Sequence, residues 1–310
     1  MIALGGNALQ ENNNISPKQQ IEVCKKTAMT IVTLLQKGHS IALVHGNGPQ
    51  VGEIISSFEK AHNLDKSHPL YPMDVCNAFT QGYIGYHLQN SLNEALINAR
   101  LDKKATTIIT QVEVAKDDPA FKKPTKPIGR FYTREEAMNL MAVEKFPMLE
   151  DSGRGWRRVV PSPKPLDIVE KDIIKTVFES GSITISCGGG GIPVTKMNSG
   201  VYHGVDAVID KDYAASKLAQ LLEFELLLIL TNVDNVYINF LQENQIALTS
   251  IKANSLDKYI EKGYFAEGSM LPKVLAAKQF VESGQKRQSI ITSLSKAHRV
   301  FEDKTGTLFF

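Results

Sequence analysis

The sequence predicts an α/β protein with a mostly parallel central sheet and helices on both of its faces. Short apolar runs alternate along the chain with longer segments in which apolar residues recur at helical spacing. Strands that are separated by helices favour parallel pairing, and the crossing helices then cover both faces of the sheet. The 310 residues suffice for one large domain or for two lobes.

The predicted elements follow one another in a regular order. A short strand at residues 2–4 leads into a glycine turn, and apolar residues then recur at helical spacing over residues 17–37. Gly38 is a typical stop signal for that helix. Residues 41–44 form a continuous apolar run, which is typical of a buried strand. Further strands are predicted at residues 106–110, 183–186, 226–230 and 289–292.

One long segment interrupts this alternation. Residues 116–165 are rich in proline, lysine and arginine and contain the single tryptophan, Trp156. A segment of this length without clear periodicity is typical of an insertion or a functional lid. We therefore predict one domain over residues 1–310, with residues 116–165 inserted as a protruding lid subdomain.

Composition and charge exclude several classes of protein. The chain is 43% hydrophobic and 22% charged, which excludes a disordered, collagen-like or coiled-coil protein. Thirty-five basic against 33 acidic residues leave a net charge of +2, so no basic field indicates nucleic-acid binding. The three cysteines lack the spacing of a zinc or redox motif, and no signal peptide or membrane-spanning run is evident. We expect a cytoplasmic protein without membrane or nucleic-acid partners.

Glycine clusters follow three of the predicted strands, where α/β proteins bind their ligands. Glycine lets backbone N–H groups approach an anion, and the helix that follows adds its positive N-terminal end. Any single cluster could simply form a tight turn, but three together favour an anion site. The candidate binding residues in these clusters are Gly5, Gly6, Asn7, Gly46, Asn47, Gly48, Gly189 and Gly190.

The familiar nucleotide-binding motifs are absent. The chain has no Gly-Lys dipeptide and hence no Walker A loop, and the glycine pattern that ends at Gly52 misses the dinucleotide fingerprint by one residue. Protein-kinase and α/β-hydrolase signatures are also missing. A nucleotide would therefore need a different cradle.

Three lysines stand next to glycine or proline at positions where a phosphate could dock. Lys126 lies in the proline-flanked strip PTKPIG, Lys211 just before a predicted helix, and Lys273 at the start of another helix. Each lysine alone could be a solvated surface group. Asp212 follows Lys211 and could hold it near a metal-bound nucleotide.

Two other features are interpreted as structural. His45 precedes the second glycine cluster, where a lone histidine at a strand end is typically a structural group. Trp156 and the arginines beside it could stack on nucleic acid, but anchoring of the lid is the simpler interpretation. Those arginines are Arg154, Arg157 and Arg158.

Taken together, these segments resemble carbamate kinases, within the amino acid kinase superfamily. The resemblance extends in order over almost the whole chain, and the lid strip, the GRGW segment and the four glycines are specific to carbamate kinases among their relatives. Asn232 is a departure, since the family commonly has glycine there. The matching segments are residues 3–8 (ALGGNA), 45–52 (HGNGPQVG), 80–82 (TQG), 84–86 (IGY), 124–129 (PTKPIG), 153–165 (GRGWRRVVPSPKP), 186–193 (SCGGGGIP), 204–212 (GVDAVIDKD) and 268–273 (GSMLPK).

The resemblance implies a fold, a reaction and a set of site residues. It implies a three-layer α/β/α sandwich, a homodimer, and reversible Mg²⁺-dependent phosphoryl transfer between ATP and carbamate that gives ADP and carbamoyl phosphate. It places the reaction in arginine catabolism by the arginine deiminase pathway, running toward ATP. Lys126, Lys211 and Lys273 would be catalytic, and no protein ligand to the metal is implied. The nucleotide would contact Lys211, Asp212, Thr231, Val233, Tyr237, Ala266, Ser269, Met270 and Lys273.

This chemistry needs no general base. Carbamate is already an anion, so phosphoryl transfer depends on alignment and on neutralisation of charge. Two alternatives remain open at this point. One is a kinase of the same fold that acts on a larger carboxylic acid, and the other is a catalytically silent sensor of carbamoyl phosphate or nucleotide.

Substitution Gly6→Val should abolish phosphoryl transfer while the fold stays largely intact. The branched side chain would fill the space in which backbone N–H groups must meet an anion, and it disfavours a positive φ. Activity and circular dichroism of the purified variant test this. A folded and fully active Gly6→Val protein would show that the glycine serves the turn alone.

Overall fold

An eight-stranded sheet forms the centre of the fold. The computed structural model describes residues 1–5, 16–151, 153–302 and 305–310. Within them the strands of this sheet pair in parallel, except for the antiparallel pair of β16 and β17. In spatial order they are β15 (Ser250–Ile251), β17 (Thr307–Phe309), β16 (Gln288–Ser293), β12 (Leu226–Thr231), β1 (Ile2–Leu4), β2 (Ala42–His45), β9 (Ile183–Ile185) and β3 (Ala105–Thr107).

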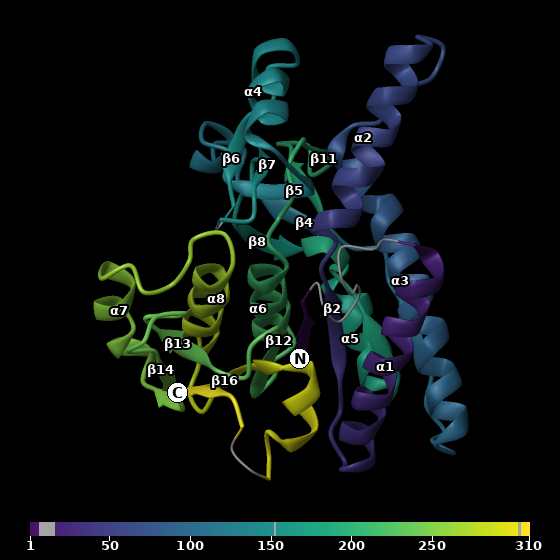
Figure 1. Cartoon of the computed structure of the whole chain (residues 1–310). Coiled ribbons are helices and arrows are strands. Elements are labelled where there is room, and N and C mark those ends of the chain that lie inside the picture. Colours follow the sequence, from purple (N-terminus) through teal and green to yellow (C-terminus); the bar gives the residue numbers. More distant parts are fainter. Residues whose placement is uncertain (6–15, 152, 303–304) are drawn as a thin grey trace.

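Helices bury both faces of this sheet, because successive side chains on each strand belong to two different apolar cores. Ala3 and Ile229 lie in the core that the sheet shares with α5, α6 and α8, whereas Leu4 lies in the core shared with α1 and α3. Figure 1 shows α6 and α8 on one side of the strands and α1 and α3 on the other. The predicted three-layer α/β/α sandwich is confirmed. These helices are α1 (Pro17–Gln36), α3 (Met73–Asn98), α5 (Lys171–Glu179), α6 (Lys211–Leu221) and α8 (Met270–Glu282).

The predicted first helix and its stop at Gly38 are confirmed, and the structure adds a cap at its start. The hydroxyl oxygen of Ser16 accepts a hydrogen bond from the Gln19 N–H at 3.4 Å and caps α1. At the other end Gly38 has a φ of +89° and donates its N–H to the Leu35 carbonyl at 2.9 Å. The chain then turns directly into β2.

One predicted strand is too long. The expectation of a strand over residues 106–110 is wrong beyond Thr107, where β3 ends. The reason is a side chain of α3: the Gln81 amide accepts from the Thr110 N–H at 2.9 Å and donates to the Thr110 carbonyl at 3.0 Å. The Gln81 oxygen takes the Thr110 N–H, and the Thr110 carbonyl also accepts the Ile192 N–H at 2.9 Å, so these groups are not available to a ladder in the central sheet. The other predicted strands all fall in the central sheet.

A second sheet of four strands follows the order β11-β10-β4-β8. It comprises β11 (Tyr202–Gly204), β10 (Ile192–Lys196), β4 (Gln111–Val114) and β8 (Pro165–Ile168). Smaller elements complete the description: the hairpin of β13 (Val236–Ile238) and β14 (Ile246–Leu248), the helix α7 (Asp257–Glu261), and 3-10 helices at Pro119–Phe121, Gly188–Gly190, Ala253–Ser255 and Leu294–Arg299. None of the helices in the described part of the chain has the length and apolarity needed to cross a bilayer.

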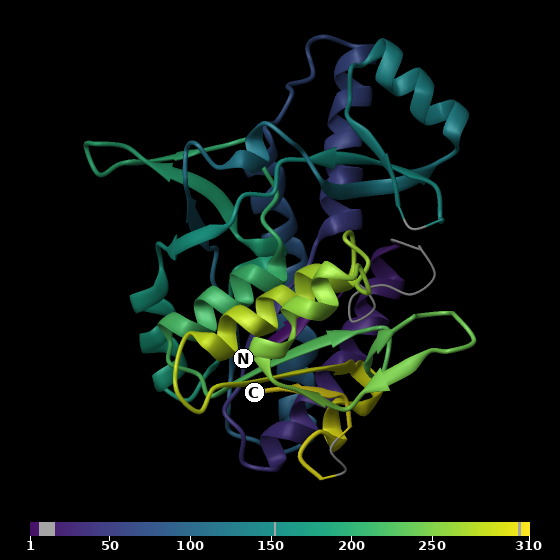
Figure 2. The same ribbon diagram turned by 90° about the vertical axis from the view of Figure 1, so that its left-hand side faces the viewer.

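The segment of residues 116–165 contains a small sheet, the helix α4 and the 3-10 helix at Pro119–Phe121. Its strands follow the order β5-β7-β6, and both views show them with α4 at one end of the molecule, away from the central sheet (Figures 1 and 2). The chain enters this segment from β4 and leaves it into β8, and β4 and β8 pair antiparallel. Its elements are β5 (Lys126–Tyr132), α4 (Arg134–Val143), β6 (Met148–Glu150) and β7 (Trp156–Val160).

Helix α2 (Gly48–Leu64) contacts this small sheet through two facing glycines. A Cβ added to Gly52 would lie 2.1 Å from the backbone N of Gly129, which has a φ of +70° in β5. Contacts at this distance do not occur between real side chains and backbone. The two backbones approach this closely because Gly52 carries no side chain, while the positive φ of Gly129 favours glycine there as well.

Substitution Gly52→Ala should destabilise the protein by about 1–3 kcal/mol, since the new methyl group must push β5 away from α2. The control is Gly82→Ala in α3, where an added Cβ would meet nothing within 4 Å. That control should gain about 0.5–1 kcal/mol, because alanine favours a helix over glycine. Denaturant unfolding of both variants measures the difference. A Gly52→Ala protein as stable as wild type would contradict the close packing.

Candidate active site

Glycine loops gather at the carboxyl ends of neighbouring strands. The Gly5 N–H donates to the Leu230 carbonyl at 3.1 Å, and the Gly46 N–H donates to the Leu4 carbonyl at 3.2 Å. These contacts bring the ends of β12, β1 and β2 together, and Gly188–Gly190 follow β9, the next strand of the sheet. The structure thus places Gly5 and the other two predicted clusters at the carboxyl ends of neighbouring strands. Gly6 and Asn7 lie outside the described residues.

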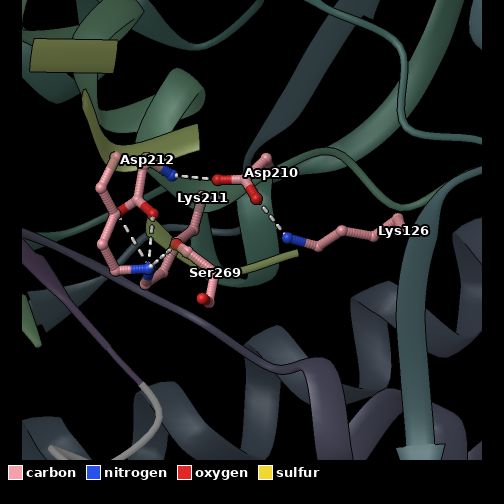
Figure 3. Close-up of polar contacts among 6 residues, drawn as sticks. Lys126, Asp210, Lys211, Asp212 and Ser269 are labelled. Atoms are coloured by element: carbon pink, nitrogen blue, oxygen red, sulfur yellow. Dashed lines mark hydrogen bonds and ion pairs between the residues drawn. The ribbon is translucent and has the colours of Figure 1, made fainter. Parts of the chain in front are cut away.

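The three predicted lysines converge beside these loops, although they come from three different elements. Lys126 begins β5, Lys211 begins α6, and Lys273 lies in the first turn of α8. The Asp212 carboxylate binds two of them, with Oδ1 2.9 Å from the Lys211 Nζ and Oδ2 3.4 Å from the Lys273 Nζ. Lys126 pairs instead with the Oδ2 atom of Asp210 (Figure 3).

Asp210 has two partners at once. Its Oδ1 accepts a hydrogen bond from the Asp212 N–H at 2.9 Å, which caps α6, while its Oδ2 faces Lys126 (Figure 3). Only 9% of its side chain is exposed. Burial alone would raise the pKa of this carboxyl, but Lys126, Lys211 and Lys273 outweigh burial and hold the pKa far below its usual range.

The two lysines that share Asp212 differ in their electrostatics. Burial lowers the pKa of Lys211, but the carboxylates of Asp212 and Asp210 more than compensate, so its pKa lies above the usual value. At Lys273 burial prevails: its pKa is lowered, with the positive charge of Lys211 adding to the effect and Asp212 opposing it. Lys273 therefore loses its proton more readily than Lys211.

A cavity of about 170 Å³ lies among these groups. It brings together the second glycine loop, one residue of the four-glycine run and two of the lysines. Its lining residues are Gly46, Asn47, Gly48, Pro49, Gln50, Lys126, Pro127, Arg157, Gly189, Ile209, Lys211 and Gly268. A larger cavity of about 360 Å³ lies between α2 and the β5-β7-β6 sheet, but none of the three lysines lines it. The chemistry therefore points to the smaller cavity.

Helix α3 holds the second glycine loop in place. The buried Asn47 amide donates both of its hydrogens, to the Asn77 Oδ1 at 3.0 Å and to the Thr80 Oγ1 at 2.8 Å. Gly189 packs directly on this amide, since a Cβ there would lie 2.2 Å from the Asn47 Nδ2, and its φ is +69°. Gly190, which was also predicted to bind substrate, packs instead against the Ile209 carbonyl and does not line the cavity.

The whole chain matches known carbamate kinases. Residues 1–293 match the amino acid kinase family. The chain is 54% identical over 308 residues to the carbamate kinase of Clostridium perfringens, a match that covers 99% of this chain and 98% of that protein. It is 49% identical over the same length to carbamate kinase 3 of Staphylococcus aureus, with 99% and 98% covered. The chain belongs to the carbamate kinases of the amino acid kinase family.

Solved structures of this family share the fold. The chain superposes on the Giardia lamblia carbamate kinase bound to AMP-PNP with a TM-score of 0.87 and 41% identity, covering 100% of this chain and 97% of that one. The citric acid complex of the same protein gives a TM-score of 0.92 at 41% identity, with 100% and 97% covered. The arrangement of sheets and helices is therefore that of the family.

Apart from the lysines and Asp212, the residues that the resemblance assigns to the nucleotide come from the end of β12, from β13 and the turn before it, and from the start of α8. Thr231 ends β12, Tyr237 lies in β13, and Ala266, Ser269 and Met270 surround the start of α8. The Lys273 Nζ donates to the Ser269 carbonyl at 3.1 Å, which ties this region to the lysine cluster. Val233 lies in the turn between β12 and β13. None of these residues lines the cavity of about 170 Å³.

Sequence reasoning missed Arg157. Its side chain, 12% exposed, lines the cavity, donates from Nη2 to the Gly129 carbonyl at 2.9 Å and pairs through Nη1 with Asp151 at 3.3 Å. Among the described residues its buried Nε atom has no hydrogen-bond partner. Its position next to the GRGW segment indicates a functional region. The sequence does not reveal, however, which of Arg154, Arg157 and Arg158 faces the cavity.

His45 is buried and neutral, and its role as a structural group stays a prediction. Its Nδ1 lies 2.9 Å from the Gly46 carbonyl, and burial lowers its pKa to about 4. The described part of the chain offers no partner to its Nε2. No group of three His, Cys, Asp or Glu side chains in the described part of the chain is arranged to hold a metal ion.

Substitution Lys211→Ala should lower kcat by roughly 100-fold or more, a far larger effect than its effect on nucleotide affinity. A preorganised cation that faces developing charge stabilises mainly the transition state, by on the order of 3 kcal/mol. Lys217→Ala, further along α6 and outside the cavity lining, is the matched control and should keep its turnover. Steady-state kinetics decide: an unchanged kcat with a raised KM for ATP would make Lys211 a ground-state binder.

Proposed function

We propose that this chain is a carbamate kinase enzyme, which transfers a phosphoryl group reversibly between ATP and carbamate, giving ADP and carbamoyl phosphate. The observation that carries the proposal is the convergence of Lys126, Lys211 and Lys273 on two carboxylates beside a cavity bordered by glycine. The relatives that it matches over 99% of its length are named carbamate kinases, and one related structure holds AMP-PNP.

In this proposal the glycine loops hold the anionic substrate. Gly46, Gly48 and Gly189 line the cavity. The Gly46 N–H is bound to the Leu4 carbonyl, whereas glycine at positions 48 and 189 leaves backbone N–H groups accessible to an anion. The N-terminal end of α2 starts at Gly48 and adds its positive dipole. Carbamate enters as an anion, so no side chain has to remove a proton before it attacks.

The lysines neutralise the charge that moves during transfer. Lys126 and Lys211 line the cavity and would contact the phosphoryl oxygens, while Lys273 lies on the nucleotide side and would contact the leaving ADP. Asp212 holds the ammonium groups of Lys211 and Lys273 close to each other, because its one carboxylate binds both. Alignment and charge compensation then provide most of the catalysis.

The site is compatible with a magnesium ion that arrives with the nucleotide. Asp210 and Asp212 are both engaged by lysines, but Mg²⁺ favours phosphate oxygens and retains several waters, so it needs no direct protein ligand. When bound, the ion would neutralise phosphate charge, and Asp212 would orient a water on it. We further propose a cytoplasmic homodimer that works toward ATP in arginine catabolism, which follows from the family resemblance.

An assay of ADP phosphorylation with a panel of acyl phosphates tests the activity. Carbamoyl phosphate should be the effective donor, because the cavity of about 170 Å³ suits a small acid. Equal use of acetyl phosphate would weaken the assignment to carbamate, and preference for a larger acyl phosphate would favour a related kinase. Absence of turnover with every donor would favour a catalytically silent sensor.

We also propose that residues 116–165 act as a lid. The chain enters and leaves this segment on the adjacent strands β4 and β8, and the segment carries Lys126 and Arg157 to the cavity. Pro127 follows Lys126 and restricts its backbone, so the lysine is carried as a fixed part of the segment. Closure would deliver its charge and exclude water.

Hydrogen exchange tests the lid. Residues 116–165 should exchange readily in the free enzyme and become protected when Mg-ADP and carbamoyl phosphate are added, with α1 peptides as the internal reference. Lys126→Ala should lower kcat but leave ADP binding nearly unchanged, since the assigned nucleotide residues lie elsewhere. Identical protection in both states, together with a fully active Lys126→Ala enzyme, would mean a rigid segment and a solvated lysine.

A further inference from the structure

Asp210 is the second carboxylate that binds a lysine at the site. As a whole residue Asp210 is 7% exposed. It lies two residues before Asp212 and does not line the cavity. It nevertheless touches the one lysine of the three that Asp212 does not bind. Each ammonium group therefore has a carboxylate partner, and that of Lys126 is provided by Asp210.

Lys126 differs from the other two lysines in how it is held. Lys211 and Lys273 extend from helices that pack against the central sheet, and their side chains are 11% and 14% exposed. Lys126 extends from the separate β5-β7-β6 sheet, and its side chain is 24% exposed. It has the most freedom to move outward, and the like charge of the other two lysines would push it in that direction.

The partner of Lys126 is itself rigid. Asp210 Oδ1 is engaged by the Asp212 N–H at 2.9 Å, so the carboxylate orientation is set by the first turn of α6. The remaining oxygen, Oδ2, is then directed at the Lys126 ammonium (Figure 3). Lys126 would otherwise move with the β5-β7-β6 sheet. The ion pair with Asp210 holds its ammonium group next to α6, which carries Lys211 and Asp212.

We propose that Asp210 is a positioning residue, which holds the Lys126 ammonium at the cavity so that it meets the transferring phosphoryl group in place. This inference rests on the proposed phosphoryl transfer but assigns the reaction a residue beyond it. Asp210 itself touches no reacting atom. Its effect on turnover should therefore pass mainly through Lys126, although its charge also helps to keep Lys211 protonated.

A double-mutant cycle with Asp210→Asn and Lys126→Ala tests this. Asparagine keeps an oxygen for the Asp212 N–H but removes the charge that binds Lys126, so the thermal midpoint should stay close to wild type. We expect kcat to fall about 10-fold to 100-fold, as for a misplaced catalytic group, while the KM for carbamoyl phosphate changes little. In the Lys126→Ala background the same substitution should change kcat by less than about 2-fold.

A matched control comes from a second aspartate with the same two kinds of partner. Asp167 accepts the Ile168 N–H at 2.9 Å and pairs with Lys171, outside the cavity lining. Asp167→Asn should leave kcat unchanged. Should Asp210→Asn fold poorly, Asp210→Ser provides a second variant, because serine also caps a helix without carrying charge.

Three outcomes would overturn the proposal. The first is an Asp210→Asn enzyme with wild-type kcat, and the second is an equal loss of kcat with and without Lys126, which would mean that Asp210 acts independently. The third is a lower KM with a raised kcat, which would make the ion pair an obstacle to substrate. The wild-type enzyme distinguishes these from a failure of the proposed function: if it uses another acyl phosphate, the cycle is run with that donor, and if it uses none, both proposals fail.

Discussion

The cavity depends on the neutralisation of three lysine ammonium groups by two carboxylates at the start of α6. Like charges that lie close together in a partly buried site repel one another strongly, so three unpaired cations would not stay in one place. Asp212 binds two of them and Asp210 the third. The site thus keeps one net positive charge, three cations less two anions, which an anionic substrate can use.

This arrangement requires that several elements end at the same place. The carboxyl ends of β12, β1, β2 and β9 lie side by side in the sheet, and glycine follows three of them. Side chains at Gly189 or Gly190 would clash with Asn47 or with the Ile209 carbonyl. Glycine at these positions allows the close packing of the loops that lets the start of α6 approach them.

The separate sheet of β5, β6 and β7 contributes positively charged side chains to the cavity. It brings Lys126 and Arg157 to the cavity, and it contacts the body of the molecule where Gly52 faces Gly129. The contact between the two glycines and the ion pair of Lys126 with Asp210 differ in kind, since the first is a steric fit of two backbones and the second is electrostatic. Together they determine where Lys126 lies relative to α6.

The sequence by itself determined most strands of the central sheet, helix α1, the starts of α6 and α8, the glycine loops and the three lysines, because these depend on local periodicity and on residue chemistry. Only the tertiary structure decided which carboxylate faces which lysine, since Lys126 and Asp210 are 84 residues apart. It also decided the end of β3, where the Gln81 side chain takes over the Thr110 backbone, and the inward position of Arg157 among three neighbouring arginines. Such contacts join residues that are distant in sequence, so no local pattern encodes them.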